Sequence, residues 1–217
     1  MTQPTIAVNP DAKRRALLFL ALAGAILWFP LVPLLAGRPP GFLRDLGFLS
    51  GPTGTPLAWA LGFVVAFAYA GFTVRNNPLV REHWRALTPA KVLAVAAAIG
   101  AAVVEEAFFR RLLMDGLMGA GIPSAGQILA SGVIFGLAHG IWGIVTGRLM
   151  MGVRIVVATG TVGTALAVVY VVGDRSLAPP IVSHFLITAT IQPGIMYAAF
   201  SGQMARPQRG WWRLTRP

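Results

Sequence analysis

The sequence has no cysteine and few acidic residues, and both scarcities narrow the classes of protein it can belong to. Seven Asp and Glu stand against 18 Lys and Arg, and only 12% of the 217 residues are charged. A soluble globular domain has about a quarter of its residues charged. The lack of cysteine excludes a disulfide framework and a thiolate nucleophile, so a metal site would depend on His and carboxylate side chains.

Apolar residues dominate the chain instead. They make up 56% of it, and the mean hydropathy is +0.70. Six apolar runs alternate with short polar segments, at about 16–36, 56–74, 92–114, 127–145, 155–172 and 177–200. Because a helix of about 20 apolar residues crosses a bilayer, we predict an all-α, polytopic transmembrane helical bundle with about six spans.

The basic residues lie between the apolar runs and not on one basic face, which favours a membrane surface over nucleic acid as their partner. In alternate connections, 13 of the 18 Lys and Arg fall on the side of both termini and 5 on the other. The positive-inside rule then predicts cytoplasmic termini. We expect a multi-pass integral membrane protein of a bacterial cell membrane, with the lipid bilayer as a partner and no nucleic acid.

Composition divides the chain into four parts. Residues 1–12 form a polar tail, and 13–91 hold two helices and a cytoplasmic loop. Residues 92–200 form a core of four helices, and 201–217 form a basic, aromatic tail typical of a membrane interface. Three irregular segments are expected within this plan: a polar loop over 75–91, a turn over 115–126 and a kink at Pro193.

Two adjacent glutamates, Glu105 and Glu106, lie inside the third apolar run. Ionised groups are costly within a membrane, so acidic residues there predict a functional site. Arg110 follows Glu106 by four residues and shares its face of the helix. We therefore predict an ion pair between Glu106 and Arg110, with Glu105 directed toward other helices.

Histidines occur in two further apolar runs, His139 in the fourth and His184 in the sixth. Counting about 1.5 Å per residue from the helix ends allows these side chains to meet Glu105 at a shared depth. We therefore predict a common pocket for the three. Small residues at helical spacing lie beside His139, and we expect them to admit a second helix that carries a carboxylate: Gly132, Gly136 and Gly140.

A carboxylate and a histidine in a desolvated pocket can together deprotonate water, and a second histidine can donate a hydrogen bond to a developing oxyanion. Glu105, His139 and His184 therefore predict a hydrolase that needs neither a serine nor a cysteine nucleophile. The same three side chains are the expected ligands if a divalent metal is bound, although the chain has no His-Glu-x-x-His motif. We predict no cofactor, with a divalent metal as the alternative.

Three short motifs carry a family resemblance: Glu105-Glu106-x-x-x-Arg110, Phe135-x-x-x-His139, and His184 in Leu177-Ala-Pro-Pro-Ile-Val-Ser-His184. In order and approximate spacing they resemble the CPBP family of intramembrane proteases. This family includes the CAAX prenyl proteases and bacteriocin-processing or immunity proteins, and the resemblance covers about residues 92–200. It implies that Glu105 and His139 activate water.

The resemblance also implies that Glu106 and Arg110 support the site and that His184 acts at the oxyanion. One position departs from the family, because Thr188 stands where an asparagine commonly follows the last histidine by four residues. A threonine hydroxyl donates one hydrogen bond but reaches less far than an amide. Either the hydroxyl substitutes for the amide, or activity is reduced or lost. Phe135 is expected to pack beside the site and not to contact the substrate.

We therefore predict a CPBP-type intramembrane endopeptidase that hydrolyses peptide bonds of a membrane-associated protein or peptide. One alternative, favoured by Thr188, is a non-catalytic membrane protein that binds a partner as an immunity or scaffolding protein. The other is a proton-coupled transporter in which Glu105 and Glu106 carry protons, although the inverted repeats typical of transporters are not visible. The charge count places the carboxylates in the non-cytoplasmic half of the bilayer, whereas family members that cleave prenylated proteins act from the cytosolic side.

Overall fold

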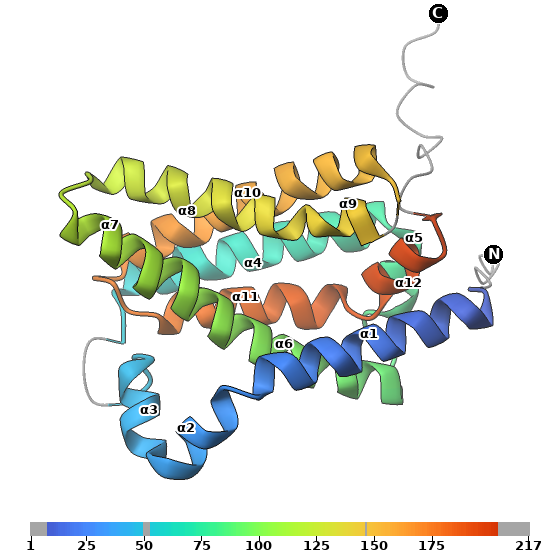
Figure 1. Cartoon of the computed structure of the whole chain (residues 1–217), viewed down its shortest axis with the longest axis horizontal. Helices are drawn as coiled ribbons and strands as arrows, with labels where there is room; N and C mark the ends of the chain where they lie inside the picture. The colour runs from blue at the N-terminus through green and yellow to red at the C-terminus, as the bar shows by residue number, and fades with distance from the viewer. Residues whose placement is uncertain (1–7, 50–52, 146, 204–217) are drawn as a thin grey trace, which may run out of the picture.

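A computed structural model describes residues 8–49, 53–145 and 147–203. The described residues form a bundle of helices without a strand, which confirms the predicted all-α, polytopic architecture (Figure 1). Three helices are long and apolar enough to cross a membrane, and two bent helix pairs raise the number to as many as five. The predicted fourth span is instead a 16-residue apolar helix followed by a short one, because the chain breaks at Gly140.

In chain order the helices are α1 (Pro10–Trp28), α2 (Leu31–Gly37), α3 (Pro39–Asp45), α4 (Pro56–Asn76), α5 (Pro78–His83), α6 (Pro89–Glu106), the π-helix η1 (Ala107–Met114), α7 (Asp115–Gly119), α8 (Ser124–His139), α9 (Ile141–Val145), α10 (Leu149–Val172), α11 (Ala178–Ile191) and α12 (Gly194–Phe200).

The same local signal opens four of these helices. The residue before each helix accepts a backbone N–H of the first turn with its side-chain oxygen, and the next residue, the first of the helix, is proline. The four capping residues are Asn9, Thr55, Asn77 and Thr88. Proline fits there because the first N–H groups of a helix have no partner within the helix. The Thr55 hydroxyl also donates to the carbonyl of Val172 at 2.9 Å and so joins the start of α4 to the end of α10.

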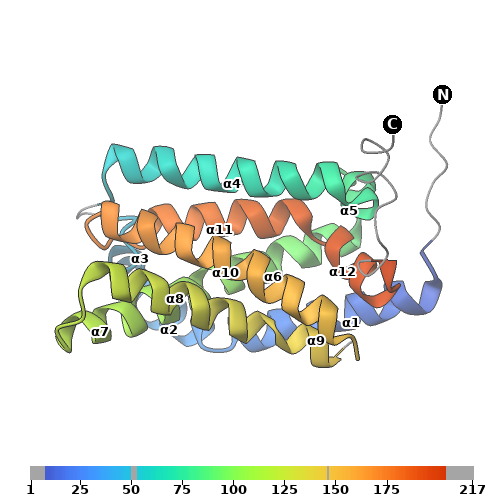
Figure 2. The ribbon, with the colours of Figure 1, turned by 90° about the horizontal axis from the view of Figure 1, so that it is seen from above.

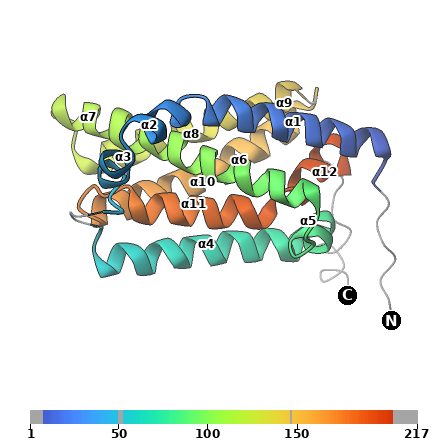
Figure 3. The same cartoon turned by 90° about the horizontal axis from the view of Figure 1, so that it is seen from below.

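Helices α6 and α11 occupy the middle of the bundle. Figure 3 shows them between α1 on one side and α4 on the other. Figure 2 shows α4, α11, α10 and α8 side by side, with α8 packed along α10. The two central helices carry Glu105, Glu106 and His184, so three of the predicted site residues lie between layers of apolar helices.

The two ends of the bundle correspond to the alternate connections of the sequence. The start of α1 and the end of α12 lie at one end together with α5 and α9, while α2, α3 and α7 lie at the other (Figure 1). The described connections therefore fall into the two groups used in the charge count, except that Arg110 is buried within the bundle. The side of the membrane that each end faces stays a prediction.

The glycine stripe of α8 admits a close neighbour, as expected, but the neighbour is α10. A Cβ added to Gly136 would lie 2.5 Å from the Val156 carbonyl oxygen and 2.9 Å from the Gly160 Cα. Helix α10 contains no Asp or Glu. The expectation that the stripe brings a carboxylate toward His139 is therefore wrong, and Glu105 reaches His139 from α6 instead.

The predicted turn over 115–126 is also wrong at its start. Residues 89–119 form one helical run of 31 residues that includes η1 and α7. Asp115 remains helical because its carboxylate accepts the Tyr170 hydroxyl at 3.0 Å and a guanidinium N–H of Arg175. These distant partners replace the solvent that a turn would offer, and the chain reverses only between Gly119 and Ser124.

Proline accounts for the two bends in the bundle. The predicted kink at Pro193 is confirmed, since α11 and α12 meet there at 58°. The first apolar run bends by 44° between α1 and α2, next to Pro30. In both cases proline removes a backbone donor from the helical ladder.

The polar loop expected over 75–91 is largely helical, because it contains α5 and the start of α6. Lys91 is only 8% exposed within α6, so its assignment to an exposed loop is wrong. Most of the predicted polar tail over 1–12 and basic tail over 201–217 lies outside the described residues. The division of the chain into four parts stays a prediction.

Candidate active site

Glu105 and Glu106 are the last two residues of α6, where the helix widens into η1. A π-helix is rare, and π-helical turns within α-helices are frequently found at functional sites. The helical run continues through this junction without a break. The two glutamates therefore sit on continuous helix, which holds them more rigidly than a loop would.

Glu106 is fully buried and holds two partners. Its Oε2 lies 2.8 Å from Arg110 Nε, and Arg110 Nη2 donates to Oε1 at 3.4 Å, so the predicted ion pair is present. The Nε–H is poorly aligned with Oε2, which makes the shorter contact an ion pair and not a hydrogen bond. The same Oε1 lies 2.9 Å from His184 Nδ1. Glu106 thus orients His184 as well as Arg110.

Arg110 extends this buried network to α8. Its Nη1 donates to the Ser131 hydroxyl at 2.6 Å, and that hydroxyl donates to the Phe109 carbonyl at 3.0 Å. Ser131 was absent from the predicted site. It lies four residues before Phe135, which lies four before His139, so helical spacing along α8 was the signal that would have revealed it.

Glu105 faces the two histidines. Its Oε2 lies 3.6 Å from His139 Nε2 and 3.9 Å from His184 Nε2, so the three side chains share one pocket, as predicted. That oxygen is buried and has no hydrogen-bond partner among the described residues. Buried polar atoms are nearly always paired. The unpaired oxygen therefore marks a place prepared for another molecule.

The partner at Nδ1 orients each imidazole. His139 Nδ1 lies 2.9 Å from the Phe135 carbonyl, which can only accept, so Nδ1 carries a proton and donates it. His184 Nδ1 faces Glu106 Oε1 in the same way. In a neutral ring Nε2 is then the acceptor. Both histidines therefore present Nε2 to Glu105.

Phe135 packs between the two imidazole rings. Its ring centroid lies 4.5 Å from that of His139 and 5.8 Å from that of His184, edge-on in the second case. The side chain is buried, with 3% exposed. The expectation that Phe135 packs beside the site is therefore confirmed, and the ring limits rotation of both histidines.

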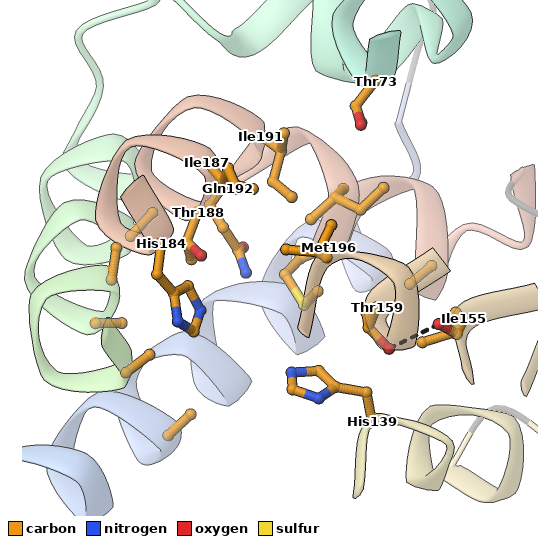
Figure 4. Close-up of a pocket in the computed structure, with 18 of the residues that line it drawn as sticks. Thr73, His139, Ile155, Thr159, His184, Ile187, Thr188, Ile191, Gln192 and Met196 are labelled. Atoms are coloured by element: carbon orange, nitrogen blue, oxygen red, sulfur yellow. Dashed lines mark hydrogen bonds between the residues drawn. The ribbon is translucent and has the colours of Figure 1, made fainter. Parts of the chain in front are cut away.

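A cavity of about 420 Å³ adjoins these residues, and Figure 4 shows His139 and His184 on opposite sides of it. Thr188 also lines it, one helical turn after His184. Most of the lining is apolar, with contributions from α1, α4, α6, α10, α11 and α12. The cavity runs toward the end of the bundle where α1 begins, as its lining by Thr73 and Met151 shows. This is the end that the charge count assigns to the cytoplasm.

A family model described as type II CAAX prenyl endopeptidase Rce1-like matches residues 88–190. This stretch of the chain is similar to that family. The predicted resemblance to the CPBP and CAAX proteases is thereby confirmed, and the matched range contains every predicted site residue. No curated protein and no solved structure matched the chain significantly. The similarity supports, in general, a CAAX-type intramembrane endopeptidase that works in a lipid bilayer on a protein substrate.

Several polar residues that line this cavity were not predicted. Gln192 and Arg154 both line it. Gln192 follows Thr188 by four residues, and it is the only amide side chain between Leu177 and Phe200. Its spacing on the face of His184 was a usable signal that the interpretation of Thr188 alone overlooked.

The described residues contain no group of three His, Cys, Asp or Glu side chains that would hold a metal ion. Glu105, His139 and His184 approach one another without forming such a group, and the Glu106 carboxylate holds Nδ1 of His184. No step of the proposed reaction is routed through a metal.

Proposed function

We propose that the chain hydrolyses a peptide bond of a membrane-associated protein or peptide with water that Glu105 and His139 activate. The observation that carries the proposal is the unpaired Oε2 of Glu105, 3.6 Å from His139 Nε2 and buried beside a cavity. A carboxylate oxygen and a neutral Nε2 are both acceptors. Water has two O–H groups and can donate to both at once.

In the proposed reaction, water donates one hydrogen bond to Glu105 and one to His139 as its oxygen attacks the substrate carbonyl. One of these side chains takes the proton, and the carbonyl oxygen becomes an oxyanion. The protonated side chain then returns the proton to the leaving amine as the C–N bond breaks. The products are a carboxylic acid and an amine, and no covalent intermediate with the protein is formed.

His184 is proposed to stabilise the oxyanion. Its Nε2 lies on the cavity side of the ring, 3.9 Å from Glu105 Oε2, while its Nδ1 is held by Glu106. A protonated ring would donate from Nε2 to the developing negative charge, and the Glu106 carboxylate would stabilise that protonated form. Glu106 and Arg110 are proposed to hold this geometry without contacting the substrate.

The wall of the cavity supports an apolar, membrane-embedded substrate. Along α6 it consists of small side chains that leave room for a chain to lie against the helix: Ala94, Ala97, Ala98 and Ala101. Leu20 and Leu27 of α1 face the same space. Apolar pockets of several hundred Å³ with a few polar groups are typical ligand sites. A lipidated peptide fits these properties.

A farnesylated peptide that ends in Cys-Val-Leu-Ser is a suitable probe, because a C-terminal CAAX sequence with Ser last is a farnesylation signal. We expect purified protein in liposomes to cleave it and Glu105→Gln to lower the rate by about 10²- to 10⁴-fold, the usual contribution of a general base. Glu82→Gln is the matched control, since Glu82 is exposed on α5. Cleavage by Glu105→Gln at the wild-type rate sinks the proposal, and a rate that survives a chelator supports the route without a metal.

The orientation belongs to the same proposal: both termini face the cytoplasm of a bacterial cell, so the cavity extends toward the cytoplasmic end. The absence of cysteine makes this simple to measure with a membrane-impermeant maleimide. In intact cells we expect labelling of Ser124→Cys, at the exposed start of α8, and none of Glu82→Cys. The opposite pattern contradicts the orientation.

A further inference from the structure

Gln192 is a polar residue at the cavity to which the proposed reaction assigns no role. It lines the cavity, and its side-chain Oε1 is buried without a hydrogen-bond partner among the described residues. An amide has two N–H donors and one acceptor. Leaving a buried amide oxygen unpaired costs about 1 to 3 kcal/mol, so a structural role alone does not explain a glutamine here.

Gln192 lies in line with His184 and Thr188. His184 and Thr188 lie on the face of α11 that borders the cavity, and Gln192, the C-cap residue of that helix, follows four residues later and also lines the cavity. Figure 4 shows the Gln192 side chain directed into the cavity beside Thr188, on the side from which His184 enters. Successive positions on this face are about 6 Å apart along the axis. The long side chain of Gln192 can therefore extend back into the part of the cavity beside Thr188.

Lys91 holds the backbone of Gln192 in place. Its Nζ donates to the carbonyl of Gln192 at 2.7 Å, to that of Thr190 at 3.3 Å and to that of Ala189. Two of these carbonyls belong to the last turn of α11 and the third to its C-cap residue, where the helix offers no donor of its own. Burying a lysine with no acidic partner is costly. Its position therefore fixes the point at which α11 ends and Gln192 turns into the cavity.

Thr188 differs from the two other threonines that line the cavity. Thr73 and Thr159 each donate to the carbonyl four residues earlier, at 2.8 and 2.7 Å. Among the described residues, no hydrogen bond from the Thr188 hydroxyl is present. Its short side chain leaves space on the cavity face between His184 and Gln192.

We infer that Gln192 is a further catalytic residue whose amide N–H donates to the oxyanion of the tetrahedral intermediate, and that Lys91 is its positioning residue. This inference rests on the proposed peptide hydrolysis. Its physical basis is an amide donor held at a largely apolar cavity, where such a hydrogen bond is strong and needs no reorganisation during the reaction. Donation uses only N–H and leaves the amide chemically unchanged.

The test compares Gln192→Leu with the wild type on the farnesylated Cys-Val-Leu-Ser peptide in liposomes. Leucine keeps the bulk of the side chain and removes its donors. We expect kcat to fall by about 10²- to 10³-fold, as for the loss of one oxyanion donor, with KM nearly unchanged. Ile195→Leu, a cavity-lining change that conserves volume, is the control. An unchanged kcat for Gln192→Leu overturns the inference.

A second variant separates catalysis from folding. Thr188→Asn places an amide on the same face one turn closer to His184, so we expect it to restore kcat of Gln192→Leu by about tenfold or more, one donor being worth at least that. A purely structural role for Gln192 would not respond to an amide at another position. A deficit that Thr188→Asn leaves in place, together with a lower melting temperature of Gln192→Leu, overturns the inference.

Lys91 is tested by a double-mutant cycle with Gln192. We expect Lys91→Met to lower kcat about tenfold in the wild type and by less than about twofold in Gln192→Leu, because residues that act through one another are not additive. Equal losses in both backgrounds contradict the positioning role. If the wild type cleaves nothing, the proposed function fails; if it cleaves and only Glu105→Gln is inactive, the inference about Gln192 alone fails.

Discussion

Two polar clusters lie on the same helical run, and they are built in opposite ways. Around Glu105, the contacts to His139 and His184 are 3.6 and 3.9 Å, longer than direct hydrogen bonds, and one carboxylate oxygen has no partner among the described residues. Around Asp115, both carboxylate oxygens accept the Tyr170 hydroxyl, and Arg175 donates to one of them.

The outer members of the Asp115 cluster are hydrogen-bonded as well. Arg175 donates to Gln127 Oε1, and Gln127 Nε2 donates to the Ile122 carbonyl at 2.6 Å. Its members thus join α7, α8 and α10 through groups that satisfy one another. A cluster with every group satisfied stabilises a fold, whereas one with unpaired groups beside a cavity is prepared for a substrate. Composition alone would not have told them apart, because both contain a carboxylate and a cation.

The largest effect on stability is expected from Glu106, which belongs to the active-site cluster but is paired like the Asp115 cluster. Glu106→Gln leaves the guanidinium of Arg110 buried, with 0% of either side chain exposed, and without its counter-charge. We expect a loss of about 3 to 5 kcal/mol in the free energy of unfolding, together with loss of activity. Unfolding in mixed detergent micelles measures it, and an unchanged stability would show that burial of the pair has been overstated.

The glycine contact between α8 and α10 should give the next effect. In Gly136→Ala the new methyl meets the backbone of Val156 and Gly160, neither of which can rotate away. We expect a loss of about 1 to 3 kcal/mol from overpacking. Gly116→Ala is the matched control, because a Cβ there meets nothing within 4 Å. Equal stability of the two variants would contradict the close approach of these helices.

Asp115→Asn should have the smallest effect and should affect stability only. Arg175 and Asp115 are 23% and 33% exposed, so solvent screens their interaction, and we expect a loss of about 1 kcal/mol. The rate of peptide cleavage should change by less than about twofold, because no hydrogen bond or ion pair among the described residues joins the two clusters. A large loss of kcat in Asp115→Asn would contradict the assignment of this cluster to stability alone.

Local patterns in the sequence predicted the parts of the site that one helix determines. The Glu106–Arg110 pair follows from a spacing of four within one helical run. The kink at Pro193 also follows from the chemistry of one residue. The depths of Glu105, His139 and His184 along their helices allowed a shared pocket, but the packing of three helices decides that these side chains meet.

Features that depend on the choice of partner helix were not predictable. A glycine stripe shows that some helix approaches α8 closely, but nothing in it selects α10 over α6. The contact of His184 with Glu106 joins residues 78 apart in the chain. The helical state of Asp115 likewise depends on Tyr170, 55 residues away. Such contacts are set by the packing of the whole bundle.

The central claim is that the Glu105 carboxylate, which has an unpaired oxygen, takes part in the reaction, whereas the fully paired Asp115 carboxylate stabilises the fold. The most direct measurement is the initial rate of cleavage of the farnesylated Cys-Val-Leu-Ser peptide by Glu105→Gln and Asp115→Asn, each with its free energy of unfolding. We predict a rate lower by at least about 10²-fold for Glu105→Gln at nearly wild-type stability, and a wild-type rate for Asp115→Asn at reduced stability. Equal rates for the two variants, or a loss of rate in Glu105→Gln explained by unfolding, would contradict the account.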